Sequence, residues 1–192
     1  MKTKKPKSTI FTVISIAAIV IALVFVSQSQ KENRLKETSL EKLSEAEKIL
    51  EMNLDNEYPT TPREVAGLHG DMTRLLYSGV DDDEIKKLAN KIRELYDEEF
   101  LENNPEQQYL RELYTDIALW LQEDRKIEFN AVVNKDQEDI QTLEGKEYAT
   151  AHISFTITGK GKTSEIRRYL MRKDKDERWK ILGWEYMTSK SE

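Results

Sequence analysis

Hydrophobic residues follow three patterns along this chain, and each predicts a different kind of element. Residues 10–26 form an apolar run in which only Thr12 and Ser15 are polar. Residues 31–123 repeat apolar positions at helical spacing, whereas residues 127–188 alternate apolar and polar positions as strands do. The chain therefore predicts an N-terminal apolar helix, then amphipathic helices, then a sheet.

The apolar run predicts a transmembrane helix over residues 10–26. At about 1.5 Å per residue, such a helix just spans a bilayer core of roughly 30 Å. All basic residues of the tail, residues 1–9, lie on one side of it, which places the tail in the cytoplasm and the C-terminal part outside. The alternative is a cleaved signal peptide, but the run is longer than a usual signal core and Ser27-Gln28-Ser29 is a poor cleavage site.

Residues 27–53 are expected to form a helical stalk or linker. Within them, residues 31–52 carry an amphipathic stripe made of Leu35, Leu40, Leu43, Ala46 and Leu50. A coiled coil would need three or four clean heptads, so we expect the stalk to pack on its own domain. Tyr58-Pro59 and Thr61-Pro62 then break the helix, which places the extracytoplasmic domain at residues 54–192.

The first helix of this domain begins with strong capping signals. Thr61 is expected to be the N-cap, Pro62 the first helical residue and Glu64 the second half of a capping box. Gly79 is expected to end the helix in a left-handed conformation. The predicted buried stripe is Val65, Leu68, Met72, Leu75 and Leu76.

Two further features of these helices need an explanation. Gly67 and Gly70 interrupt the first helix, and we expect another element to pack closely there. Asp81, Asp82 and Asp83 invite a metal interpretation, but they lack the alternation of a calcium loop, so we expect them to cap the second helix. That helix is predicted to bury Ile85, Leu88, Ala89, Ile92, Leu95 and Tyr96.

Asn104-Pro105 is expected to cap and start a third helix that ends near Glu123 to Arg125. Glu98 and Glu99, before it, are expected to face solvent. The predicted stripe of the third helix is Tyr109, Leu110, Leu113, Tyr114, Ile117 and Leu121.

The strands are predicted from alternation. Ile127, Phe129, Ala131 and Val133 should share one face of the first strand, and residues 139–143 form a short strand before a turn at Glu144-Gly145. The clearest strand should bury Ala149, Ala151, Ile153, Phe155 and Ile157. Strands at 165–173 and 179–188 follow, the last with Trp184 and Tyr186 on the face opposite Ile181.

Charge and composition exclude several classes of function. The chain has 30 basic and 36 acidic residues, and four lysines lie in the tail, so the remainder has 26 basic against 36 acidic residues, a net charge of −10. Such a domain is unsuited to nucleic acid. The chain has no cysteine, which excludes disulfides, thiolate metal sites and cysteine nucleophiles.

Helices followed by a strand meander define an α+β fold, with three helices packed on a curved antiparallel sheet. The helix order over 62–123 and the meander over 147–188, ending in Arg178 to Trp184, resemble the NTF2-like, or cystatin-like, cone. Residues 58–65 (YPTTPREV), 102–106 (ENNPE) and 172–184 resemble a family of uncharacterised single-pass membrane proteins of anaerobic Gram-positive bacteria. That family has no assigned activity, cofactor or site residues, so the resemblance implies none.

Candidate chemistry is sparse. His69 and Asp71 are two apart on a helix and should not face each other. His69 and His152 are interpreted as surface or rim residues. Trp120, Trp179, Trp184 and Tyr186 are interpreted as core residues. The buried stripes, such as Val65 and Leu113, offer no base, so any ionisable group in the interior would have to come from Tyr77, Tyr96, Tyr169 or an acid in the last two strands.

We therefore expect no catalytic, cofactor-binding or metal-binding residues. The predicted function is that of a membrane-anchored extracytoplasmic binding or scaffold domain with a protein partner at the cell surface, in an assembly of the secretion or conjugation type. The sequence allows a weak homodimer. The alternatives are a small-ligand sensor and an NTF2-like isomerase or hydrolase that uses the cone cavity.

Overall fold

In the computed structural model of this protein, the described residues are 44–133 and 139–187. Ser44 falls in the unit Met1–Ser44, and the other described residues fall in the unit Glu45–Glu192. The predicted transmembrane helix lies outside the described residues. Of the helices within them, none has the length and apolar character needed to cross a membrane.

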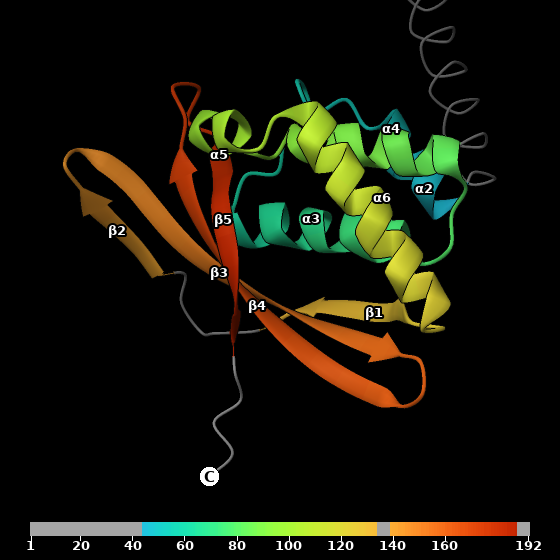
Figure 1. Ribbon diagram of the computed structural model, residues 1–192. Helices are drawn as coiled ribbons and strands as arrows, with labels where there is room; N and C mark the ends of the chain where they lie inside the picture. The colour runs from blue at the N-terminus through green and yellow to red at the C-terminus, as the bar shows by residue number, and fades with distance from the viewer. Residues whose placement is uncertain (1–43, 134–138, 188–192) are drawn as a thin grey trace, which may run out of the picture. The chain divides into compact units, whose positions relative to one another are not determined.

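Helices fill the first part of the unit Glu45–Glu192 (Figure 1). α3, α4 and α6 are the three predicted helices, α2 is the described end of the predicted stalk, and α5 was not predicted. Their bounds are α2 (Glu45–Glu51), α3 (Pro62–Leu76), α4 (Asp82–Arg93), α5 (Glu98–Asn103) and α6 (Glu106–Gln122).

The capping box of α3 is confirmed. The Thr61 hydroxyl accepts a hydrogen bond from the Glu64 backbone N–H (3.2 Å), and the Glu64 carboxylate accepts one from the Thr61 N–H (3.1 Å). The other end differs from the prediction. Tyr77 is the C-cap, and Gly79, with φ of 93°, lies in the turn after the helix has ended.

The start of α4 is also confirmed, because the Asp81 side chain accepts from the Glu84 N–H (2.8 Å). The predicted N-cap role of Asn104 is wrong. Asn104 instead ends α5, and its side-chain amide donates to the Phe100 carbonyl (2.8 Å). α6 begins after Pro105 without a side-chain cap, because the chain enters it directly from α5.

The strands form one antiparallel sheet in the order β1-β3-β4-β5. β2 pairs with the first part of β3, and β1 pairs with its last part. Glu144 and Gly145 both have positive φ, 52° and 77°, which confirms the predicted hairpin turn. The bounds are β1 (Lys126–Val132), β2 (Asp139–Leu143), β3 (Lys146–Thr158), β4 (Lys162–Lys173) and β5 (Trp179–Met187).

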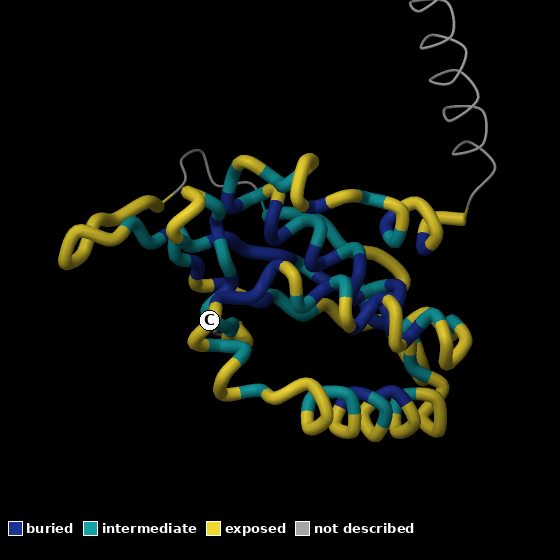
Figure 2. The backbone as a smooth tube through the Cα atoms, turned by 90° about the horizontal axis from the view of Figure 1, so that it is seen from above, coloured by how far each residue is buried: buried dark blue, intermediate teal, exposed yellow. Residues whose placement is uncertain are grey.

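The core lies between α3 and one face of this sheet, which we call the inner face. The predicted buried face of β3 is confirmed, and Phe155 and Ile153 are fully buried. A Cβ added to Gly70 would lie 3.0 Å from Asn130 Nδ2 and 3.3 Å from Ile153 Cγ2. The expected close packing at this glycine is therefore confirmed, and Figure 2 shows the buried residues gathered in the middle of the unit.

A β-bulge corrects the predicted faces of β1. Ile127 is paired and buried, but Glu128 has no partner in the register, and Phe129 pairs with Thr156 on β3. The extra residue inverts the alternation, so Phe129 is exposed and Asn130 points toward α3.

A second bulge corrects β5. Gly183 and Ile181 pair with consecutive residues of β4, so Leu182 between them has no partner in the register. The side chains after this bulge change faces, and Trp184 joins Ile181 on the inner face. The prediction that Trp184 and Tyr186 lie opposite Ile181 is therefore wrong.

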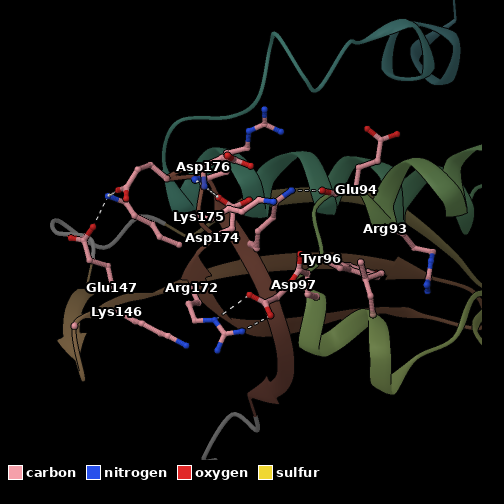
Figure 3. A pocket seen from close by; sticks show the side chains of 17 residues that line it. Arg93, Glu94, Tyr96, Asp97, Lys146, Glu147, Arg172, Asp174, Lys175 and Asp176 are labelled. Carbon is pink, nitrogen blue, oxygen red and sulfur yellow. Dashed lines mark hydrogen bonds and ion pairs between the residues drawn. The ribbon is translucent and has the colours of Figure 1, made fainter.

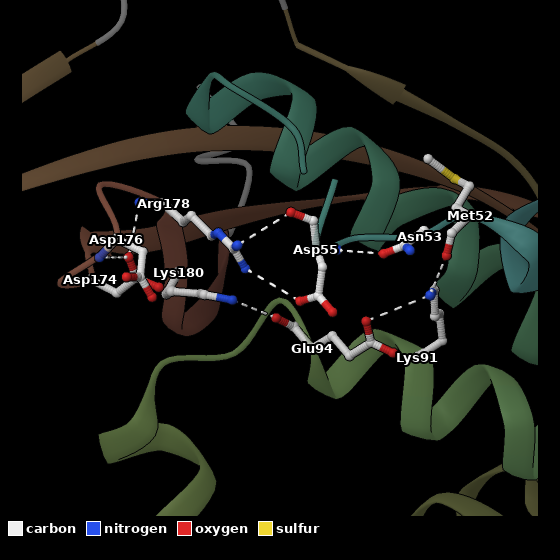
Figure 4. A network of polar contacts seen from close by, with 9 residues as sticks. All are labelled: Met52, Asn53, Asp55, Lys91, Glu94, Asp174, Asp176, Arg178 and Lys180. Atoms are coloured by element: carbon white, nitrogen blue, oxygen red, sulfur yellow. Dashed lines mark hydrogen bonds and ion pairs between the residues drawn. The ribbon is translucent and has the colours of Figure 1, made fainter. Parts of the chain in front are cut away.

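α2 lies before residue 54, where the sequence placed the start of the domain, and its Ile49 is buried in the same core. Polar contacts hold the segment after α2 to the rest of the unit (Figure 4). Lys91 Nζ donates to the Met52 carbonyl (2.5 Å), and Lys180 Nζ donates to the Glu94 carbonyl (2.7 Å). These bonds join α2, the end of α4 and β5.

Candidate functional site

His69 lies inside the protein, and the prediction of a surface or rim position is wrong. It is 1% exposed. It occupies the face of α3 that also carries Val65 and Met72, and that face packs on the sheet. The position of His69 inside the protein therefore follows from the helical period, whereas the polarity of its side chain wrongly suggested the surface.

Hydroxyl groups surround the imidazole of His69. Nε2 lies 3.2 Å from the Tyr96 hydroxyl, and Nδ1 lies 3.0 Å from the Tyr169 hydroxyl. Thr73 Oγ1 lies 3.3 Å from Nδ1 and donates to the His69 carbonyl (2.8 Å). The Trp184 ring packs on the imidazole with centroids 5.2 Å apart. We call these five residues the His69 cluster.

The His69 cluster is uncharged. Burial, together with the positive charge of Arg167, lowers the pKa of His69 from 6.5 to about 3. Burial likewise raises the pKa of Tyr96 and of Tyr169. A neutral imidazole donates through one nitrogen and accepts through the other, so the surrounding hydroxyls satisfy it.

A buried arginine lies beside this cluster on the inner face. Arg167 Nε donates to Glu165 Oε1 (2.7 Å). The guanidinium carbon lies 4.6 Å from the centroid of the Phe155 ring and 5.3 Å from that of Tyr186. The aromatic faces and the carboxylate together stabilise a cation that is largely removed from water.

The expectation that the interior offers no base is wrong, because the His69 imidazole lies there. The acid expected in the last two strands is Glu165, which pairs with an arginine. Of the three tyrosines named as alternatives, Tyr96 and Tyr169 bond to His69, whereas the Tyr77 hydroxyl donates to the Asp116 carboxylate on α6.

His69 and Asp71 form no pair, as expected from their spacing. Asp71 instead accepts a hydrogen bond from Asn130 Nδ2 (2.9 Å). Arg74 Nε donates to Oδ1 of the same Asn130 side chain (2.9 Å). His152 lies on the outer face of β3, but it is buried rather than at the surface. The two histidines are on opposite faces of the sheet.

An open cleft of about 710 Å³ lies at the end of the sheet where the β2–β3 hairpin turns (Figure 3). Its walls come from the α4–α5 connection (93–98), the hairpin turn (145–147) and the segment from the end of β4 to the start of β5 (172–180). Charged side chains dominate these walls, and we call it the charged cleft.

An ion pair between the buried Asp97 and the partly buried Arg172 forms one wall of the charged cleft. Arg172 Nη2 donates to Asp97 Oδ1 (2.5 Å) and its Nε donates to Oδ2 (3.2 Å). Asp97 also caps α5, because its side chain accepts from the Glu99 N–H (3.0 Å). The hydrogen bond that Arg172 donates to Asp97 raises the pKa of Arg172. This carboxylate is therefore fully occupied by structural contacts.

Other charges in the charged cleft also pair. Lys173 Nζ lies 2.5 Å from Glu147 Oε2 and 3.3 Å from Glu177 Oε2. Lys146 and Lys175 at the rim are exposed. Interleaved cations and anions suit a polar surface of another molecule, because they offer donors and acceptors over a wide area.

Within the described chain, no group of three or more histidine, aspartate or glutamate residues could hold a metal ion. Asp81 serves as a helix cap, as expected. That the protein needs no cofactor stays a prediction.

One signal in the sequence could have revealed the interior charges. Arg167 is two residues before Tyr169 and four before Met171, so it lies on the same face of β4. A charged residue therefore occupies an inward position of an otherwise apolar face. The Asp97-Glu98-Glu99 run likewise has the composition of a helix start, which predicts α5.

Comparisons with known proteins complete the description. No curated protein matches the chain. A family model described as a domain of unknown function, DUF6715, matches residues 1–184. A similar solved structure is that of CagV, a VirB8 homolog of the T4SS from Helicobacter pylori strain 26695, with a TM-score of 0.40 and 11% identity over 66% of this chain and 99% of that one.

Proposed function

Because the chain belongs to DUF6715, a family of unknown function, we propose its function from its own geometry: it is a membrane-tethered, extracytoplasmic domain that binds a protein partner. We also propose that it is not an enzyme. The α+β fold and the family match support a folded domain. The protein partner and the extracytoplasmic location are what we propose in addition.

The observation that carries the proposal is the contrast between a closed interior and the open charged cleft. Of the residues in the His69 cluster, His69 is the one whose side chain could act as a general base. However, it is 1% exposed, and both of its ring nitrogens face hydroxyls. A general base has to reach a substrate proton within hydrogen-bonding distance. The cleft is open, and its Arg172 and Lys173 pair with carboxylates, which suits recognition rather than proton transfer.

The membrane tether in the proposal comes from the apolar run at residues 10–26 and the lysines before it. Protease added to intact cells stripped of their wall should remove a C-terminal tag. Protection of the tag, or release of a mature chain that begins near Gln28, would contradict the tether.

The proposal includes an assembly of the secretion or conjugation type. CagV is described as a VirB8 homolog of a T4SS, but at a TM-score of 0.40 this likeness adds no weight. The sequence-based expectation is therefore the source of this part of the proposal.

Site-specific photo-crosslinking of the full-length chain in its native membrane tests the partner. A photoreactive residue at Lys146 or at Lys175, both on the rim of the charged cleft, should give an adduct with the same partner protein. Lys160 is the matched control, because it is an exposed lysine in the turn at the other end of β3. Adducts from neither rim position, or the same adduct from Lys160, would contradict the proposal.

A further inference from the structure

The outer face of the sheet carries an apolar surface at β4 and β5. In Figure 1 the described helices lie on the other side of the sheet. Leu170 is 44% exposed, and Met187 is exposed to a similar extent. By the register, Ile166 pairs with Met187, and Leu170 pairs with Gly183. We call the outward side chains of these pairs, with Arg168 and Glu185 between them, the β4–β5 face.

A hollow marks one end of the β4–β5 face. A cavity of about 410 Å³ lies over Gly183, with Leu170, Leu182 and Thr150 among its walls. A Cβ added to Gly183 would meet no atom within 4 Å. The hollow exists because the bulge at Leu182 puts a residue without a side chain opposite Leu170.

An ion pair lies in the middle of the β4–β5 face. Arg168 and Glu185 are direct cross-strand partners, and the guanidinium contacts the carboxylate. Both side chains are about half exposed. The face therefore has three rows of paired residues: an apolar row, a charged row, and a row with a protruding leucine beside a hollow.

We propose that two copies of this chain pack their β4–β5 faces together about a two-fold axis that runs parallel to the strands, between β4 and β5. Such an axis places β4 of one copy over β5 of the other. Leu170 then lies over Gly183 of the second copy and enters its hollow, and Arg168 lies over Glu185 of the second copy.

A second copy is the occupant that fits because the face is complementary to itself under this rotation. The rotation lays each row of one copy over the same row of the other copy, with the β4 residue over the β5 residue. Each protruding leucine therefore faces a hollow, and each cation faces an anion. The strands of the two sheets stay aligned, at the roughly 10 Å separation of packed sheets. An unrelated partner would have to supply both the leucine and the exchanged charges.

Light scattering of the full-length chain in detergent gives the first test. The wild-type chain should be a dimer, and Leu170→Glu should raise the dissociation constant roughly tenfold or more, because it replaces the leucine by a carboxylate in a hollow that Glu185 helps to line. Leu143→Glu is the control, because Leu143 is also an exposed leucine but lies on β2. A wild-type monomer, or equal losses in the two variants, would overturn the proposal.

A charge exchange gives the second test. Arg168→Glu leaves only anions in the charged row, and Glu185→Arg leaves only cations, so each variant alone should dimerise poorly. Co-expressed with different tags, the two full-length variants should form a mixed dimer in large excess over either homodimer, because every opposing pair is then opposite in charge. A statistical mixture, or no mixed dimer, would overturn the proposal even if both variants fold.

Discussion

Arg167 and Arg168 are neighbours on β4, yet they are in opposite environments. Arg167 points to the inner face, where its side chain is 8% exposed and pairs with Glu165. Arg168 points to the outer face, where its side chain is 47% exposed and pairs with Glu185. Both have a carboxylate partner, so the number of ion pairs does not distinguish them.

The difference shows that burial, and not pairing, decides what a charge contributes. A pair in water gains little, whereas removing one partner of a buried pair leaves a charge that water cannot stabilise. The same contrast extends along the strands: Phe155 and Tyr169 pack on the inner face, and Thr156 and Leu170 lie on the outer one. Changes on the two faces should therefore differ in size.

The largest difference is expected at β3. Phe155→Ala should lower the free energy of unfolding by about 3–5 kcal/mol, because it leaves a cavity in the core and removes the ring under Arg167. Thr156→Ala, one residue on and facing outward, should lower it by less than about 0.5 kcal/mol. Urea unfolding of both variants measures this, and comparable losses would show that the faces are wrongly assigned.

The next largest difference is expected between the stability contributions of the two ion pairs, Arg167–Glu165 and Arg168–Glu185. Glu165→Ala should cost about 2–4 kcal/mol in unfolding free energy, because the buried Arg167 loses its hydrogen-bonded carboxylate. Glu185→Ala removes the partner of the exposed Arg168 and should cost about 0–1 kcal/mol. Unfolding at concentrations below self-association keeps dimer effects out of the comparison. Equal costs would contradict the role given to burial.

The inner face should also make stability depend on pH. The pKa of His69 is about 3 in the folded protein against an ordinary 6.5, so the unfolded chain binds more protons between these values. Stability should therefore fall as the pH drops below about 6.5, by at most about 1.4 kcal/mol per pH unit from this residue. His69→Gln should flatten this part of the pH profile, and an unchanged profile would contradict it.

The smallest difference concerns one hydroxyl. Tyr169→Phe should cost about 1–2 kcal/mol in unfolding free energy, because it removes the hydroxyl partner of His69 Nδ1 and leaves the ring in place. Tyr186→Phe alters an exposed tyrosine of the neighbouring strand and should change stability little. If Tyr169→Phe were neutral, the Thr73 hydroxyl would be sufficient for that nitrogen.

The sequence by itself determined the elements whose signals are local. The Thr61–Glu64 capping box, the Glu144-Gly145 turn and the alternation along β3 depend on residues a few positions apart, so they form where the sequence places them. The capping of α4 by Asp81 belongs to the same class. Propensity and hydrogen bonds within one turn are sufficient for these features.

The tertiary structure alone decided which faces point inward after each bulge and what surrounds His69. A bulge exists only relative to a partner strand, so the unpaired Glu128 and Leu182 cannot be recognised from their own strands. The helical period puts His69 on the buried face of α3, but the hydroxyls that satisfy its ring come from Tyr96 and Tyr169, 27 and 100 residues away. Such contacts depend on how distant segments pack, and a period along one segment does not encode them.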